Sequence, residues 1–240
     1  MGTAAIQSKM EEDRLVAPIW HTILYFALWG ALAFGVKTAR PEEHRALFHF
    51  AFLNRSWIYL FGFAAEGVIF GLMYLGLRFR KTKLAELMGH GADRNELRRD
   101  IVAGALFSLV LLGVSALLLL TFPPHKETID ISPRTLPQFF FFFLMLVSAG
   151  FFEELIFRGY LFRQLSHYIS IDSAVVIQAI VFAVVHGSDQ SVGELASKFV
   201  VGGFLGFLAV QRKSLLPGMI AHGCLNGIAA VILGLSRLAG

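Results

Sequence analysis

The chain has a single cysteine, Cys224, among its 240 residues. One thiol excludes a framework of internal disulfide bonds and a cysteine-rich metal site. Charged side chains are also scarce, because Asp, Glu, Lys and Arg make up 16% of the residues, whereas soluble proteins carry about 25%. Hydrophobic residues make up 56%. This composition excludes an ordinary soluble domain and indicates a chain that lies mainly in an apolar environment.

The apolar residues are grouped in long blocks, which is typical of a protein that crosses the membrane several times. The block Ile101–Phe122 carries no charge and is long enough to span the hydrocarbon core as one helix. We therefore predict an all-α fold, a polytopic transmembrane helical bundle of about seven to eight helices with a polar intramembrane cavity. The predicted hydrophobic helices are Pro18–Val36, Trp57–Leu77, Ile101–Phe122, Leu136–Phe162, Ser173–His186, Phe199–Val210 and Leu215–Leu235.

We predict one membrane domain in two parts. Residues 1–135 hold N-terminal transmembrane helices and a basic connecting loop, and residues 136–240 form a transmembrane core whose polar motifs are interpreted below as catalytic. Met1–Val16 is polar and mixed in charge, unlike a cleavable signal peptide, so the first span should be retained. We expect a multi-pass integral membrane protein, located in the plasma membrane if the source is bacterial.

The net charge is +4, and the basic residues cluster in the connections between the apolar blocks. Anionic lipid attracts such segments, and the positive-inside rule places them on the cytosolic side of the membrane. We therefore expect membrane lipid, and no nucleic acid, as their partner. The N-terminus and the basic connection Arg78–Asp100, which should have helical character, are placed in the cytosol.

Glu153 and Glu154 directly follow an apolar run that contains consecutive phenylalanines, Phe139–Phe143. Charged side chains are unfavourable in a membrane and persist there mainly when they are paired or functional. Arg158 lies four residues after Glu154, so these two side chains can pair on a helix. They could be no more than a stabilising ion pair at a helix end. Glu153 is rotated about 100° away from that pair, which makes it the candidate working carboxylate.

Two further polar motifs lie in the hydrophobic helices that follow. Phe182 and His186 share a helix face, and His186 closes an apolar stretch, where it could act as a catalyst or as an interfacial cap. His222 and Asn226 also lie four residues apart and face one direction. They could stabilise an oxyanion in a polar cavity or form hydrogen bonds between helices. Together with the glutamate pair, these motifs predict one water-activating site.

A pair of small residues, Gly202 and Gly206, gives a G-x-x-x-G spacing. Small residues four apart allow two helix backbones to approach closely in a membrane. We interpret this spacing as a packing face.

The motifs E-E-x-x-x-R, F-x-x-x-H and H-x-x-x-N occur in this order, and the chain resembles the CAAX prenyl protease and bacteriocin-processing family of intramembrane glutamic endopeptidases, also called the abortive-infection family. The resemblance covers roughly Phe139–Ala230. It implies an endopeptidase without a cofactor or metal that cleaves a membrane-associated protein or peptide. The substrate would be a prenylated CAAX-type protein or a peptide precursor, and no substrate-binding residue can be named.

The resemblance also implies a role for each motif residue. The implied catalytic residues are Glu153, His186, His222 and Asn226, supported by Glu154 and Arg158. Glu153 would act as general base with His186 and activate a water molecule. His222 and Asn226 would stabilise the tetrahedral oxyanion.

Two other catalytic chemistries compete with this interpretation. In a zinc-dependent membrane protease, Glu153, His186 and His222 would be the metal ligands, although an H-E-x-x-H pair is missing. In a cysteine protease, Cys224 would need His222 as its base. Residues two apart on a helix point about 200° away from each other, so these two do not form a local dyad, and we expect Cys224 to serve packing.

A non-enzymatic role is the third alternative. The chain could be a non-proteolytic membrane scaffold or an immunity protein of the same family, or a transporter whose carboxylates bind a cation. Glu66, in the second predicted span, is a third carboxylate that could belong to such an ion path. We favour instead that its side chain extends to the membrane surface, pairs with a neighbouring helix, or faces the same cavity as Glu153.

Overall fold

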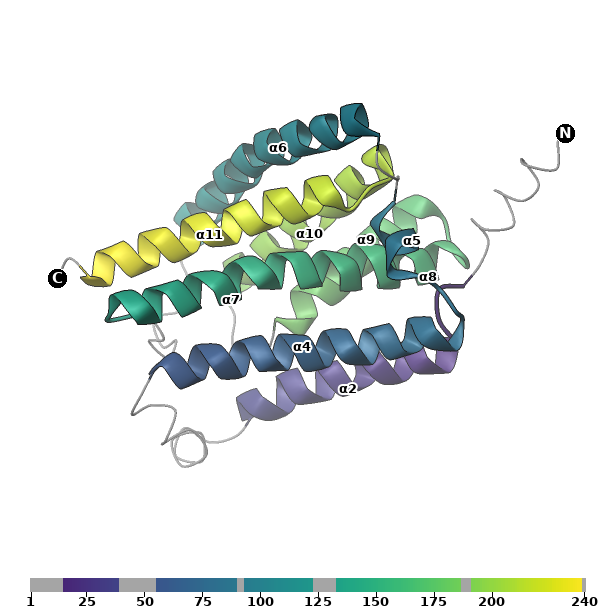
Figure 1. Cartoon of the computed structure of the whole chain (residues 1–240), viewed down its shortest axis with the longest axis horizontal. Coiled ribbons are helices and arrows are strands. Elements are labelled where there is room, and N and C mark those ends of the chain that lie inside the picture. The colour runs from purple at the N-terminus through teal and green to yellow at the C-terminus, as the bar shows by residue number, and fades with distance from the viewer. Residues whose placement is uncertain (1–14, 39–54, 90–92, 123–132, 187–190, 239–240) are drawn as a thin grey trace, which may run out of the picture.

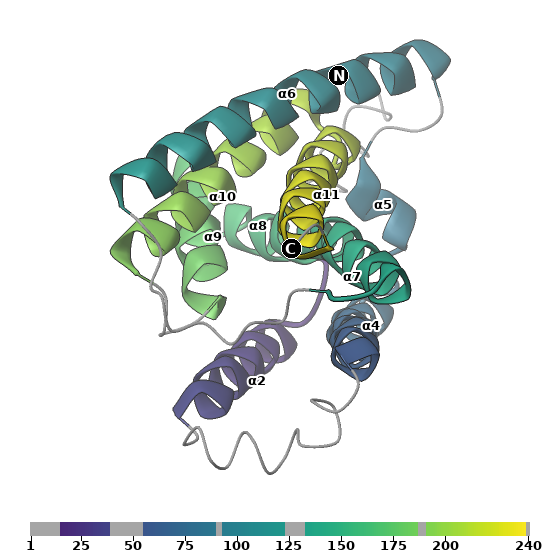
Figure 2. The same cartoon turned by 90° about the vertical axis from the view of Figure 1, so that its left-hand side faces the viewer.

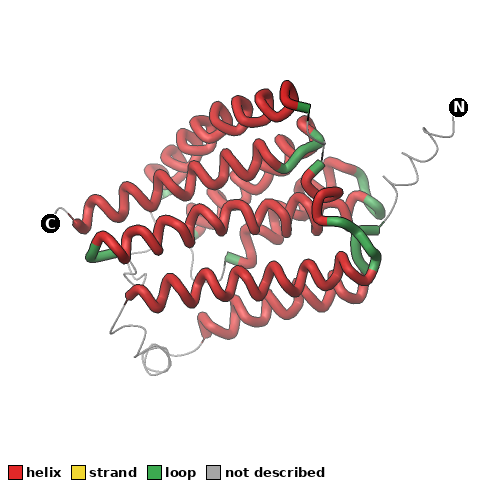
Figure 3. The backbone as a smooth tube through the Cα atoms, viewed as in Figure 1, coloured by secondary structure: helices red, strands yellow, loops and turns green. Residues whose placement is uncertain are grey.

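The computed structural model describes residues 15–38, 55–89, 93–122, 133–186 and 191–238. Within these residues the chain is a bundle of helices without strands (Figure 3). In chain order the elements are α2 (Ile19–Thr38), α4 (Arg55–Phe79), α5 (Leu84–Met88), α6 (Arg94–Thr121), α7 (Leu136–Glu154), η1 (Leu155–Leu161), α8 (Phe162–Ser166), α9 (Ile171–Val185), α10 (Val192–Arg212) and α11 (Leu216–Leu238). The predicted all-α bundle is confirmed. The connection predicted at 78–100 does have helical character, since it contains α5 and the start of α6.

Several helices have the length and apolarity of membrane spans. Among the described residues, 5 stretches qualify: Ser56–Phe79, Arg94–Thr121, Leu136–Ser166, Val192–Arg212 and Leu216–Gly234. The predicted spans at 18–36 and 173–186 correspond to shorter apolar helices, Ile19–Ala31 and Ile171–Val185. The chain is therefore a helical membrane protein, as its composition predicts.

Two helices begin earlier than the hydrophobic pattern predicts. α6 begins at Arg94 rather than at Ile101, and Asp93 caps it by accepting a hydrogen bond from the second backbone N–H that follows. α10 begins at Val192 rather than at Phe199, because its first residues form a capping box. Caps extend a helix into polar sequence by satisfying its first backbone N–H groups. A search for apolar runs therefore finds the middle of such helices and misses their first turns.

α7 and α11 lie side by side in the middle of the bundle, with α4 on the other flank of α7 and α6 against α11 (Figures 1 and 2). Glycine permits the close approach of the two central helices. A Cβ atom at Gly150 of α7 would lie only 2.9 Å from the backbone nitrogen of Gly223 in α11. This approach brings the end of α7 against the first turns of α11.

α9 and α10 form a second close pair. A Cβ atom at Gly202 would lie 3.2 Å from the Cα atom of Ala179, and one at Gly206 would lie 2.6 Å from the side-chain nitrogen of Gln178. The predicted G-x-x-x-G packing face is therefore confirmed, with α9 as its partner. The small residues also open the α10 backbone to polar side chains from neighbouring helices.

The helix that begins at Leu136 changes its winding directly after the glutamate pair. Residues 155–161 form the π-helical segment η1, and the N–H of Phe162 bonds to the carbonyl of Phe157, five residues back. All residues of η1 are buried, and the main hydrophobic cluster surrounds it. π-helical turns within longer helices occur frequently at functional sites. Here the change of winding begins directly after Glu154, at Leu155.

Candidate active site

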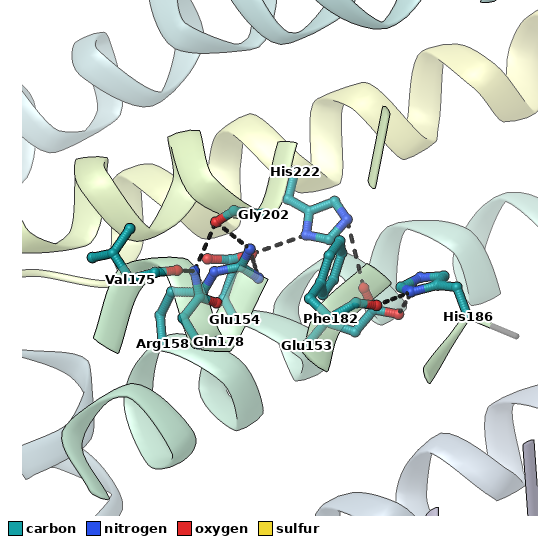
Figure 4. Close-up of polar contacts among 9 residues, drawn as sticks. All are labelled: Glu153, Glu154, Arg158, Val175, Gln178, Phe182, His186, Gly202 and His222. Carbon is teal, nitrogen blue, oxygen red and sulfur yellow. Dashed lines mark hydrogen bonds and ion pairs between the residues drawn. The ribbon is translucent and has the colours of Figure 1, made fainter. Parts of the chain in front are cut away.

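The glutamate and histidine side chains of the predicted site come from three separate helices and meet inside the bundle (Figure 4). Glu153 and Glu154 are the last residues of α7. His186 caps the C-terminus of α9, and His222 lies in the second turn of α11. The packing of α7 against α11, and of η1 against α9, brings these side chains together.

Glu154 is fully buried, with an exposure of 0%. Its Oε1 atom accepts a hydrogen bond from Nη1 of Arg158 at 2.9 Å and lies 3.0 Å from Nδ1 of His222. The predicted pairing of Glu154 with Arg158 is confirmed, whereas the contact with His222 was not predicted. A buried carboxylate is stable only where a charge and hydrogen bonds compensate it, and Glu154 has both.

The guanidinium group of Arg158 connects three helices. Nη2 of Arg158 donates a hydrogen bond to the carbonyl of Gly202 in α10 at 3.0 Å. The guanidinium carbon also lies 4.7 Å from the ring centroid of Phe182 in α9, a cation–π distance. With its bond to Glu154, the side chain fixes the start of η1 against both α9 and α10.

Glu153 has a more open environment than its neighbour, because its side chain is 20% exposed. One carboxylate oxygen, Oε1, lies 3.8 Å from Nε2 of His186, and the other, Oε2, lies 3.6 Å from Nε2 of His222. Both distances exceed that of a direct hydrogen bond. Glu153 is therefore the accessible member of the pair, and both histidines face it.

The second nitrogen of His186 is held by the backbone. Nδ1 lies 2.6 Å from the carbonyl oxygen of Phe182, one helical turn earlier. A carbonyl oxygen only accepts hydrogen bonds, so Nδ1 carries the proton and Nε2 is left to face Glu153. The ring of Phe182 packs against the rings of His186 and His222, with centroids 4.6 and 5.9 Å away. The F-x-x-x-H spacing thus fixes both the tautomer and the direction of the imidazole.

Asn226 lies on the same helix as His222 but makes a different contact. Its Nδ2 atom donates a hydrogen bond to the carbonyl of Leu146 in α7 at 2.9 Å. The hydrogen bond found for this residue thus goes to the α7 backbone and not to Glu153 or His222. A role of Asn226 in oxyanion stabilisation remains a prediction.

Sequence reasoning missed Gln178, which belongs to the same network. Its side chain is fully buried and donates from Nε2 to the carbonyl of Gly202 at 2.9 Å and to that of Val175 at 3.0 Å. Gln178, Phe182 and His186 are spaced by four residues along α9. That spacing was the signal available in the sequence, since it places a buried amide on the helix face of the F-x-x-x-H motif.

Two other residues named in the sequence analysis lie outside these contacts. Glu66 of α4 accepts a hydrogen bond from the hydroxyl of Ser148 in α7 at 2.8 Å. It therefore pairs with a neighbouring helix, which was one of the predicted alternatives. Cys224 is exposed on α11, so the prediction that it serves packing is wrong.

No group of three or more His, Cys, Asp or Glu side chains is arranged to hold a metal ion within the part of the chain that the structure describes. Glu153, His186 and His222, the ligands of the zinc alternative, do face one another. Two of their ring nitrogens already contact the Phe182 carbonyl and Glu154, and the two Nε2 atoms face the Glu153 carboxylate.

The C-terminal part of the chain matches a known protein family. Residues 135–228 match the family described as Rce1-like, type II CAAX prenyl endopeptidase. The matched range includes both glutamates, Arg158, both histidines and Asn226. No curated protein and no solved structure matches the chain.

Proposed function

Because residues 135–228 match the Rce1-like family of type II CAAX prenyl endopeptidases, we propose that the protein is an intramembrane glutamic endopeptidase. It hydrolyses a peptide bond in a membrane-associated substrate, either a prenylated CAAX-type protein or a peptide precursor. The observation that carries this proposal is the position of Glu153, whose two oxygens face Nε2 of His186 at 3.8 Å and Nε2 of His222 at 3.6 Å. If the source is bacterial, the protein resides in the plasma membrane.

In this proposal Glu153 and His186 activate the attacking water molecule. Nδ1 of His186 donates to the Phe182 carbonyl, so Nε2 offers a lone pair to a proton. A water molecule beside the pair would be within hydrogen-bonding reach of both Nε2 and the Glu153 carboxylate. Its oxygen attacks the scissile carbonyl carbon, and its proton passes to the Glu153–His186 pair. The pair then returns a proton to the leaving amine, as general acid–base catalysis requires.

The oxyanion formed by this attack is stabilised by His222 and Asn226. The Nδ1–H group of His222 donates to Glu154. When the ring carries a second proton, on Nε2, that nitrogen also donates a hydrogen bond and can stabilise the oxyanion. Asn226 has two N–H donors; one bonds to the Leu146 carbonyl, and in this proposal the second is the oxyanion donor. Removal of one oxyanion donor lowers kcat by about 10²–10³. Asn226→Ala should therefore lower kcat by that factor with little change in KM.

Glu154 and Arg158 support the site without taking part in proton transfer. Arg158 neutralises Glu154, and Glu154 orients His222 through its Nδ1 atom. A histidine held at one nitrogen presents the other in a fixed direction. These two charged side chains therefore act by placing the imidazole against Glu153.

Cleavage by the purified protein in lipid vesicles tests the proposal. The substrates are a prenylated CAAX-type peptide and its unprenylated counterpart, with products identified by mass spectrometry. We expect cleavage by the wild type and none by Glu153→Gln or His186→Ala, with folding intact in both variants. Comparison of peptide fragments from membranes that contain the wild type or Glu153→Gln would then identify natural substrates.

The same assay separates the alternative functions. A zinc-dependent protease would lose activity in the presence of a strong chelator and regain it with zinc, whereas a glutamic protease would be insensitive. A non-proteolytic scaffold or immunity protein would retain its cellular phenotype after Glu153→Gln. Loss of both cleavage and phenotype in that variant supports the enzyme.

A further inference from the structure

The face of α9 that carries the candidate catalytic histidine also carries a buried amide. Gln178, Phe182 and His186 succeed one another at intervals of four residues, so they line one side of the helix. Gln178 is 0% exposed and Phe182 is 2% exposed. The direction in which His186 points therefore depends on how α9 is rotated about its axis at Gln178.

The side-chain nitrogen of Gln178 makes two hydrogen bonds. Nε2 donates to the Gly202 carbonyl in α10 at 2.9 Å and to the Val175 carbonyl in its own helix at 3.0 Å. Gly206 provides the space for this amide, because a Cβ atom there would lie 2.6 Å from Nε2. Both N–H groups of the amide are thus used, and the one that reaches the Gly202 carbonyl joins α9 to α10 at this position.

The amide oxygen of Gln178, unlike its nitrogen, makes no stabilising hydrogen bond among the described residues. Oε1 is buried without a hydrogen-bond partner among the described residues, and a buried acceptor without a partner is unfavourable. An apolar side chain of the same length, such as methionine, would fill the same space without this penalty. Compared with methionine at this position, glutamine contributes the two hydrogen bonds that its side-chain nitrogen donates.

The carbonyl of Gly202 links Gln178 to the charged residues of the site. It accepts a hydrogen bond from Nη2 of Arg158 at 3.0 Å as well as the bond from Gln178. Arg158 in turn donates to Oε1 of Glu154, the oxygen that faces Nδ1 of His222. Figure 4 shows this continuous series of contacts from α9 to α11. A shift of the Gly202 carbonyl would therefore reach both histidines, one through α9 and the other through Arg158.

We propose that Gln178 is a positioning residue of the candidate active site: it fixes the rotation of α9 and the Gly202 carbonyl, so that His186 and His222 both face Glu153. The proposal rests on the proposed function. Gln178 touches neither substrate nor reacting atoms and acts through His186 and Arg158. Small errors in the placement of catalytic groups reduce rates strongly, by about 10²-fold for a displacement of roughly 1 Å.

The test compares Gln178→Met with Gln164→Met. Gln164 in α8 is also a buried glutamine, 4% exposed, and its amide bonds to the backbone of Val16 and Ala17, away from the glutamates. Both variants lose buried bonds to backbone groups: two donated bonds in Gln178→Met, and one donated and two accepted bonds in Gln164→Met. Each protein is purified in full length, and kcat and KM for the CAAX-type peptide are measured per folded molecule. In parallel, the ring-nitrogen NMR signals of ¹⁵N-labelled histidine are recorded, with His186→Gln and His222→Gln used for assignment.

We expect Gln178→Met to lower kcat by tenfold or more, on the order of what a displaced catalytic group produces, with KM nearly unchanged. The ring-nitrogen signals of His186 and His222 should shift in Gln178→Met and stay in place in Gln164→Met. If the signals shift but no protein cleaves the peptide, the positioning role stands and the proposed function fails. The positioning role is overturned if Gln178→Met keeps both signals and the wild-type kcat, even if its thermal stability falls. Equal effects of the two variants would also overturn it.

Discussion

The Nδ1 atom of His222 lies 3.0 Å from Oε1 of Glu154, across the interface between α11 and α7. The other nitrogen of the same ring lies 3.6 Å from Oε2 of Glu153. His222 therefore stands between a fully buried carboxylate, which is neutralised by Arg158, and a partly exposed one. Adjacent glutamates in the sequence thus have different surroundings, and their substitution should have different consequences.

Glu153→Gln should abolish cleavage without unfolding the protein. The amide has the shape of the carboxylate but does not act as a base, and loss of a general base typically lowers the rate by 10²–10⁴-fold. The Glu153 side chain is 20% exposed and more than 3.5 Å from either histidine nitrogen, so little stabilising contact is lost. Peptide cleavage and thermal unfolding in detergent are the two measurements. A Glu153→Gln protein with wild-type cleavage would remove Glu153 from the mechanism.

Glu154→Gln should instead destabilise the fold. Arg158 is 1% exposed and would keep its charge inside the bundle without the carboxylate at 2.9 Å. Loss of one partner of a buried ion pair typically costs about 3–5 kcal/mol. We expect a clear decrease in the thermal unfolding temperature, which the same detergent assay measures.

A double variant tests whether the uncompensated charge of Arg158 causes the loss of stability in Glu154→Gln. Glu154→Gln combined with Arg158→Met removes both charges, so it should recover part of the lost stability. Activity should not return, because neither the carboxylate on His222 nor the guanidinium on Gly202 is restored. A double variant no more stable than Glu154→Gln would show that the buried charge is not the source of the effect.

Gly218→Ala should impair the site through steric contact with Glu154. A Cβ atom at Gly218 would lie 2.8 Å from Oε2 of this buried carboxylate. Either α11 or Glu154 must move, and overpacking of this kind typically costs about 1–3 kcal/mol. We expect lower thermal stability and a lower kcat, since His222 lies one turn further along α11.

Gly203→Ala is the matched control for that substitution. Gly203 is also helical, but an added Cβ atom there has nothing within 4 Å. Alanine favours helix over glycine by up to about 1 kcal/mol, so this variant should be as stable as the wild type and fully active. If both glycine variants behave alike, the contact with Glu154 is not what constrains position 218.

The helices and the ion pair of Glu154 with Arg158 could be predicted from the sequence, because both depend on intervals of only a few residues along the chain. Apolar blocks indicate where helices lie, and the interval of four residues between Glu154 and Arg158 predicts their contact on one helix. The structure contains that contact at 2.9 Å. The helix ends were less predictable, since Asp93 caps α6 with a polar contact that a search for apolar runs does not detect.

Contacts between helices could not be predicted in the same way. His222 and Asn226 share a spacing of four, yet their hydrogen bonds go to Glu154 and to the Leu146 carbonyl, which lie two turns apart on α7. Which partner each side chain meets depends on how far α11 is shifted along α7. That shift is set by the close packing of the helix backbones, and a single sequence does not encode it in a readable pattern.

Glu66→Gln should retain cleavage, because the geometry around Ser148 can accommodate an amide. The Ser148 hydroxyl lies 2.8 Å from Oε2 of Glu66 and 2.9 Å from the carbonyl of Met145. A hydroxyl carries one proton, so it does not donate fully to both oxygens. In Glu66→Gln the amide N–H donates to the Ser148 oxygen and the hydroxyl proton goes to the Met145 carbonyl, which satisfies all three groups.

We therefore expect Glu66→Gln to have the wild-type kcat and unchanged or higher stability. Glu66→Leu, whose side chain offers Ser148 no polar partner, should be less stable. A large loss of kcat in a stable Glu66→Gln protein would instead make this third carboxylate part of the chemistry, because the change removes its ability to carry charge and leaves its hydrogen bond in place.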